Sequence, residues 1–183
     1  MKTKFLVTAA VALLCAAPAT AAITVLGSTS ARMCFEAAES KVIPSRDSLA
    51  QCDEALRQEA LDNRDTVATH VNRGILRARL RDIRGAISDF DTASSLDPDE
   101  PEAYLNKGMV LMRQSSADAA LPLFTMALEK KTRRPALAYF GRGVANEDLG
   151  NVRSAYFDYR AAIRADPKWK DPRLELTRFQ VSR

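Results

Sequence analysis

The sequence has 183 residues, of which 46% are hydrophobic and 27% charged, so it is long enough to form one domain with a buried core. Its 27 basic and 23 acidic residues give a formal charge of +4, and loss of Lys2 and Lys4 with a leader would lower this to about +2. So small an excess does not favour a nucleic-acid partner, because such binding depends on neutralising many phosphates.

The first 21 residues have the composition of a cleavable secretory signal. A short cationic start at 1–4 precedes the apolar run Phe5 to Leu14, and small residues at 19–21 provide a cleavage site. This run is too short to anchor the chain in a membrane, and no later stretch is long and apolar enough to span one. A buried N-terminal helix and a lipid-modified Cys15 are the alternatives, the second disfavoured by the bulky Leu14. We expect a periplasmic or secreted protein.

Two cysteines, Cys34 and Cys52, would remain after Cys15 leaves with the signal. An exported protein meets an oxidising environment in which disulfides persist. A close Cys-x-x-Cys would be more typical of a redox pair, and a zinc site would need two further ligands. We therefore predict a structural disulfide, worth roughly 3 kcal/mol in the chain-entropy model, over catalytic or metal-binding thiols.

A pattern of small and aromatic residues recurs three times over residues 67–169. Three glycines, Gly74, Gly108 and Gly143, lie 34 and 35 residues apart. Each is followed by an alanine, then an aromatic residue four positions on, then a second alanine: Ala86, Phe90 and Ala93; Ala120, Phe124 and Ala127; Ala155, Tyr159 and Ala162. A period near 34 residues with two helices per unit indicates a helical repeat.

Each element of this pattern has a packing reason. A glycine inside a helix costs about 1 kcal/mol relative to alanine, so its recurrence indicates close approach of the partner helix. The aromatic residue would fill the gap between the two helices. Asp97-Pro98 and Asp166-Pro167 are expected to end helices, because proline disfavours a helical conformation in the residue before it. Pro101 and Pro135 are expected to start the next ones.

These residues resemble three tetratricopeptide repeats, at 67–100, 101–134 and 136–169. The resemblance implies an all-α solenoid of helix-turn-helix repeats. Some positions depart from the family pattern. Thr132 stands where a proline is expected, and Pro122 lies inside the second helix of repeat two, where it predicts a kink. Gly141 replaces the asparagine that the other repeats carry at Asn72 and Asn106.

The flanks of the repeats are expected to act as caps. Residues 22–66 resemble an N-terminal helical cap or degenerate repeat, with helices near 32–41 and 45–60 stapled by the Cys34–Cys52 disulfide. The amphipathic pattern of residues 170–183 predicts a C-terminal capping helix. A solenoid needs such caps to cover its terminal apolar faces.

We expect no catalytic site, no cofactor, no metal site and hence no enzyme. The sole histidine, His70, falls where the other repeats carry Tyr104 and Tyr139, so a packed core role is favoured over a general base or metal ligand. The glycines of the repeats lie inside helices rather than in a phosphate-binding loop.

An arginine stripe, Arg73, Arg77 and Arg81, lies at four-residue spacing on one helical face. It would either contact an anionic surface or form ordinary ion pairs, each worth under about 1 kcal/mol. Arg73 with Asp89 recurs at equal spacing as Arg142 with Asp158, which suggests structural pairs.

In this family the first helix of each repeat lines the concave side. The resemblance implies a partner-binding groove of Val71, Asn72, Ile75, Arg79, Leu105, Asn106, Met109, Met112, Arg113, Phe140 and Val144. These helices are apolar on both sides, so something should cover the groove. Arg79 and Arg113 would attract acidic partner residues at one end, and Glu147 and Asp148 would repel them at the other.

The sequence therefore predicts a non-catalytic, periplasmic protein-protein interaction module that binds a peptide or helix in its concave groove. The alternative is a structural, self-associating envelope protein. In that case the groove is filled by the protein's own residues 22–30 or by a second subunit in a homodimer.

Overall fold

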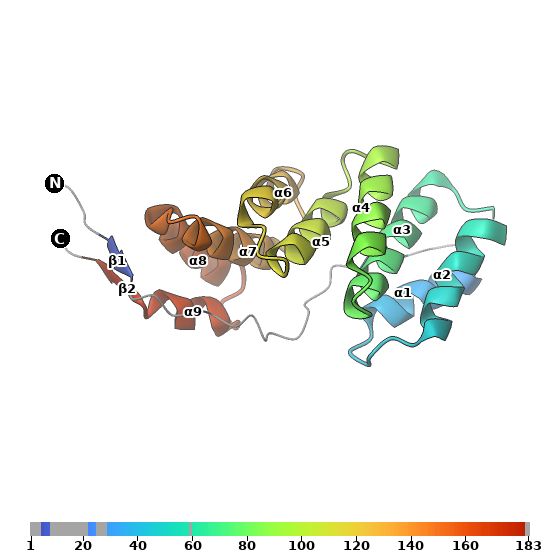
Figure 1. Cartoon of the computed structure of the whole chain (residues 1–183), viewed down its shortest axis with the longest axis horizontal. Coiled ribbons are helices and arrows are strands. Elements are labelled where there is room, and N and C mark those ends of the chain that lie inside the picture. Colours follow the sequence, from blue (N-terminus) through green and yellow to red (C-terminus); the bar gives the residue numbers. More distant parts are fainter. Residues whose placement is uncertain (1–4, 8–21, 25–28, 59, 182–183) are drawn as a thin grey trace.

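The computed structural model describes residues 5–7, 22–24, 29–58 and 60–181. Its helices are α1 (Thr29–Glu39), α2 (Arg46–Gln58), α3 (Asn63–Arg79), α4 (Ile83–Leu96), α5 (Pro101–Met112), α6 (Ala117–Glu129), α7 (Pro135–Asp148), α8 (Val152–Ala165) and α9 (Asp171–Leu176). They stack in chain order into an elongated array, with α1 and α2 at one end and α8 and α9 towards the other (Figure 1). The predicted α-helical solenoid is confirmed. The predicted signal at 1–21 lies outside the described residues, except for 5–7.

The helix boundaries follow the proline and aspartate signals of the sequence. Pro101 and Pro135 begin α5 and α7, where a missing backbone N–H costs nothing. Asp97 and Asp166 cap the C-terminal ends of α4 and α8. Asp82 caps the N-terminus of α4, because its side chain accepts a hydrogen bond from the Gly85 N–H at 3.0 Å.

The repeated glycines lie where the aromatic rings of the second helices press on the first. A Cβ atom added at Gly74 would be 2.6 Å from Cε1 of Phe90, which is too close for a real contact. Phe90, Phe124 and Tyr159 are all buried, as are the alanines that flank them in sequence. The close approach predicted from the glycines is therefore present.

Two of the departures from the family pattern have packing reasons. A Cβ at Gly141 would be 2.6 Å from Cε1 and Cζ of Phe124, so glycine there accommodates the ring of the preceding repeat. The hydroxyl of buried Thr132 donates to Glu102 Oε1 at 3.3 Å, which ties the end of repeat two to the start of α5. The third departure, Pro122, lies within α6, which continues from Ala117 to Glu129.

The N-terminal cap consists of α1 and α2, which pack on each other and on α3. A disulfide joins Cys34 of α1 to Cys52 of α2, with an S–S distance of 2.10 Å and a Cα–Cα distance of 4.9 Å. Both cysteines are fully buried in one apolar cluster with residues of α3 and α4. A second cluster is formed by residues of α5 to α8 with Phe179.

The C-terminal cap is shorter than the helix predicted at 170–183. The last helix, α9, ends at Leu176, and β2 (Phe179–Val181) follows and pairs antiparallel with β1 (Phe5–Val7). The pairing joins residues far apart in the sequence, which helical periodicity gives no means of predicting. The β-forming aromatic and branched residues Phe179 and Val181 favour the extended conformation once a partner strand is present.

Candidate functional site

The side chain of Asn72 in α3 is bonded to the main chain of another part of the protein. Its Oδ1 accepts a hydrogen bond from the Ile23 N–H at 2.8 Å, and its Nδ2 donates to the Ile23 carbonyl at 2.7 Å. Asn72 is fully buried and Ile23 is 2% exposed. A residue predicted to line the groove therefore holds the backbone of a segment that lies outside the repeats.

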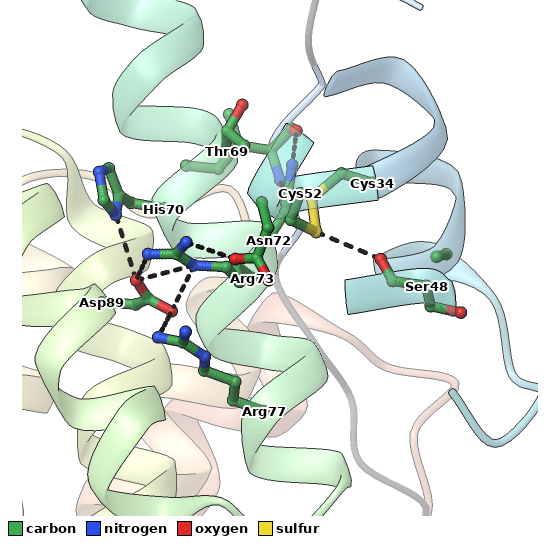
Figure 2. The surroundings of a disulfide bond; sticks show 12 residues. Cys34, Ser48, Cys52, Thr69, His70, Asn72, Arg73, Arg77 and Asp89 are labelled. Carbon is green, nitrogen blue, oxygen red and sulfur yellow. Dashed lines mark hydrogen bonds and ion pairs between the residues drawn. A yellow bond between two sulfur atoms is a disulfide. The ribbon is translucent and has the colours of Figure 1, made fainter. Parts of the chain in front are cut away.

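The Ile23 side chain joins the apolar cluster of the cap and the first repeat. That cluster contains the buried side chains of Val71 and Ile75 from α3 and both disulfide cysteines, with Ala22 packed against it. Figure 2 shows Asn72 on α3 in the surroundings of the disulfide. The concave face of repeat one is thus covered, and residues 22–24 form part of the cover.

The remaining predicted groove residues are mostly interior. Those buried are Val71, Ile75, Leu105, Asn106, Met112, Phe140 and Val144. Met109 is half-buried and Arg113 is exposed. The structure therefore does not present these side chains as one open apolar trough, and partner binding by them stays a prediction.

The asparagines of repeats one and two differ in their contacts. The Asn106 Nδ2 donates to the Glu102 carbonyl of its own helix at 2.8 Å, whereas Asn72 bonds to Ile23. The sequence places both at the same repeat position and gave no sign of this difference. It arises because residues 22–24 lie beside α3.

Arg79, which the sequence predicts to attract acidic partner residues, is hydrogen-bonded within the chain. Its guanidinium donates to the carbonyls of Ala37 and Ala38 at 3.4 Å, and also to that of Val42. These carbonyls lie at and beyond the end of α1, where backbone acceptors lack helical partners. Arg79 therefore joins the cap to repeat one.

Glu147, which the sequence predicts to repel acidic partner residues, is also paired within the chain. Its two carboxylate oxygens accept from Arg178 at 2.5 and 2.9 Å, and Oε2 accepts from the Tyr159 hydroxyl at 2.8 Å. Burial, together with the charge and hydrogen bond of Glu147, raises the pKa of the Tyr159 phenol. The ring of predicted groove residue Phe140 lies 4.8 Å from that of Trp169, centroid to centroid. The segment after α8 therefore contacts the third-repeat face.

A buried carboxylate, Asp89 of α4, faces α3 and contacts three side chains of that helix (Figure 2). Arg73 Nη2 contacts Asp89 Oδ1 at 2.7 Å, Arg77 Nη1 contacts Oδ2 at 2.8 Å, and His70 Nδ1 is 3.1 Å from Oδ1. Arg73 also reaches Asp53 of α2 at 2.7 Å. Burial by itself would raise the Asp89 pKa, but the hydrogen bonds from His70 and Arg73 and the charges of both arginines hold it below its usual value.

These contacts show that two arginines of the stripe form ion pairs within the protein. Arg73 and Arg77 are engaged by Asp89, as the ion-pair interpretation expects, and the Arg142–Asp158 pair recurs at 2.7 Å. Arg81 lies beyond the end of α3, with a φ of 68°, and its side chain is exposed. It therefore does not share with Arg73 and Arg77 the helical face that the spacing predicts. His70 is also not a simple core residue, because it contacts Asp89.

The described residues contain no group of three or more His, Cys, Asp or Glu side chains placed to hold a metal ion. Within the same part of the chain, none of the helices has the length and apolar character that crossing a membrane requires.

Comparison with known proteins places the chain in a family. Models of the tetratricopeptide repeat match residues 71–135 and 136–168, which together are more than half of the chain. Serine/threonine-protein phosphatase 5 of rat and of human are each 27% identical over 97 residues, which cover 53% of this chain. The match spans only 19% of the length of each phosphatase.

Solved structures give the same result for the fold. MamA 41-end from Desulfovibrio magneticus RS-1 matches with a TM-score of 0.64 and 22% identity, over 81% of this chain and 82% of that one. The first repeat domain of Spaghetti (RPAP3), bound to the HSP90 peptide SRMEEVD, matches with a TM-score of 0.59 and 20% identity, over 64% and 91%. The TPR domain of Arabidopsis OM64 matches with a TM-score of 0.61 and 20% identity, over 64% and 96%. The chain is a member of the tetratricopeptide repeat family.

Proposed function

We propose that this protein is a non-catalytic interaction module that is exported to the periplasm or secreted. On its concave face it holds an extended peptide segment of a protein partner. The observation that supports it is the pair of hydrogen bonds between the Asn72 amide and the N–H and C=O of one residue, Ile23. A site that binds main-chain groups in this way is suited to polypeptide rather than to nucleic acid or a small metabolite.

The contact favours an extended segment over a helix. In an extended strand the N–H and C=O of one residue point to the same side, so a single amide side chain can bind both. In a helix they point in opposite directions along the axis and are used within the helix itself. Of the two partner conformations that the sequence allows, the Asn72 contact therefore supports the extended peptide.

The fold supports the same proposal. Domains with tetratricopeptide repeats mediate protein-protein interaction, and one structural neighbour carries a bound HSP90 peptide. On this chain, Met109 and Arg113 at the concave side of repeat two retain exposed surface that a bound segment can contact. Methionine adapts to varied apolar shapes, and arginine provides a charged anchor.

Site-specific photo-crosslinking in the producing cells tests this function. Probes replace Met109 and Arg113 one at a time in the full chain. A control probe replaces Phe157, which is 49% exposed on α8, the second helix of its repeat. We expect one discrete adduct from the α5 positions that the Phe157 probe does not give, and a peptide from the crosslinked region that binds the purified protein. Adducts joining only copies of this chain would instead support the self-associating alternative.

A further inference from the structure

We propose that residues 22–24 are a built-in ligand of the first repeat, which occupies the main-chain site at Asn72. If the protein binds an extended partner segment as proposed above, that segment has to displace residues 22–24 to reach this site. The concave face of repeat one is then self-inhibited, and its accessible form is a minor state of the free protein.

The contact has the features of a peptide bound in a site. Ile23 is anchored through both of its main-chain hydrogen-bonding groups by a residue 49 positions away in the sequence. Its side chain is 2% exposed, whereas that of its neighbour Thr24 is exposed. Ala22 is half-buried against the same cluster, so residues 22 and 23 hold the segment on the protein and Thr24 reaches solvent.

The site at Asn72 favours being occupied. Asn72 is fully buried, and an amide left without hydrogen-bond partners in the interior is unfavourable. When residues 22–24 leave, water or another polypeptide backbone has to satisfy Oδ1 and Nδ2.

The ligand is tethered by a short stretch of chain. Five residues separate Ile23 from Thr29, the first residue of α1. A tether of this length gives an effective concentration on the order of millimolar. A few contacts are therefore enough to keep the site filled, and a partner with more contacts along the concave face can still compete.

Binding of a synthetic peptide with the sequence of residues 22–30 to the full chain tests displacement. In Ile23→Asp the built-in ligand is weakened, because a charge cannot enter the apolar cluster. If residues 22–24 fill the site at least nine-tenths of the time, this variant binds the labelled peptide at least about tenfold more tightly than wild type. Thr24→Asp changes an exposed neighbour and should bind as wild type does. Adding Asn72→Leu to Ile23→Asp should abolish binding.

Equal affinity of wild type and Ile23→Asp for this peptide, or strong binding by the double variant, would overturn the proposal. Because Ile23→Asp removes a core side chain, a measurement on the wild type is also needed. Amide hydrogen exchange at Ile23 should be slow in the wild type and in Thr24→Asp, and fast in Asn72→Leu. Exchange in the wild type at the rate of a free chain would contradict occupancy.

These results separate the two proposals. If the chain's own peptide binds Ile23→Asp but crosslinking finds no partner protein, residues 22–24 are a structural cover and the proposed function fails. If a partner peptide binds wild type and Ile23→Asp equally well while Ile23 is unprotected, the proposed function stands and the built-in ligand is wrong.

Discussion

At the scale of single residues, Asp89 of α4 is a buried carboxylate that balances the positive charges of α3 in the first repeat. It is 2% exposed and joined to Arg73 and Arg77, and Arg73 extends the contact to Asp53 on α2. Removing the buried member of such a group leaves the remaining charges without their buried partner, which is more costly than losing an exposed pair. Helix α4 carries both a buried aspartate, Asp89, and a half-exposed one, Asp91, so a buried and an exposed ion pair can be compared on one helix.

We expect Asp89→Asn to lower the free energy of unfolding by about 3 kcal/mol, because both arginines lose their buried counter-charge and keep only the partly exposed Asp53 and Asp82. Asp91→Asn on the same helix removes the partner of Lys107, but Asp91 is half exposed, so we expect a loss of under about 1 kcal/mol. Urea unfolding of the three proteins measures both changes. Similar losses for the two variants would show that burial does not set the strength of the Asp89 pairs.

The pKa of Asp89 also predicts a pH dependence. Its folded-state pKa is below the value of about 3.9 that aspartate has in an unfolded chain. The unfolded state therefore binds more protons between these two values, and the stabilisation is complete above the unfolded pKa and lost as the pH falls through the folded one. The stability gap between wild type and Asp89→Asn should shrink as the pH falls below about 4. A gap that stays constant into acid would contradict this assignment.

Gly141 gives a second prediction at this scale. The family pattern suggests that asparagine there would complete the groove, but the space is filled by the ring of Phe124. We expect Gly141→Asn to lower the free energy of unfolding by about 1 to 3 kcal/mol, because the added side chain overpacks the interior. Adding Phe124→Leu should recover part of the loss, as thermal unfolding of the single and double variants would show. Full stability of Gly141→Asn alone would mean that α7 can shift away from α6.

At the scale of elements, the N-terminal cap is held by contacts that the repeat pattern does not contain. The disulfide joins α1 to α2, Arg73 reaches Asp53, and Arg79 binds carbonyls at the end of α1. The apolar cluster of the cap includes residues of α3 and α4 but none of α7 or α8. In a solenoid each unit is stabilised mainly by its neighbours, so damage to one end should stay local.

Loss of the disulfide in Cys34→Ala/Cys52→Ala should therefore destabilise the cap by roughly 3 kcal/mol, given the 18-residue separation. Hydrogen exchange should accelerate in α1 and α2 and remain unchanged in α7 and α8. A reductant should produce the same pattern in wild type and no change in the double variant. Uniform acceleration along the chain would show that the protein unfolds as one cooperative unit.

Contacts that recur in every repeat can be predicted from the sequence, whereas contacts with segments outside the repeats cannot be located in the same way. The glycine, alanine and aromatic positions recur because each repeat solves the same packing problem, so the helix pairs and the Arg73–Asp89 and Arg142–Asp158 pairs could be predicted. Residues 22–30 are one of the covers that the sequence allows for the groove, but the sequence does not single out Ile23 as the partner of Asn72. The partners of Arg79 and Glu147 could not be predicted, because Val42 and Arg178 lie outside the period. Segments outside the helix pairs also reach predicted groove residues: Ile23 shares a cluster with Val71 and Ile75, and Trp169 contacts Phe140.

At the scale of the whole molecule, the two ends of the chain meet in the short ladder of β1 and β2. Phe5 pairs with Val181 and Val7 with Phe179. A two-stranded ladder of this length is marginal in isolation, so it contributes little to the stability of the solenoid. Its N-terminal strand lies within the residues that the sequence predicts to be a cleaved secretory signal.

We predict that the exported protein begins at Ala22, with Ile23 as its second residue and still bound to Asn72. Intact mass spectrometry of protein from the periplasm or medium measures this directly, and a variant with Ala19 and Ala21 replaced by bulky residues should keep its leader. Cleavage removes β1, so the amides of β2 that bond to β1 should exchange rapidly in the processed protein while the Ile23 amide stays protected. Recovery of an intact chain starting at Met1 in the exported fraction would contradict cleavage. In that case the ladder would persist and residues 22–24 would be tethered on both sides, which would make their displacement by a partner harder.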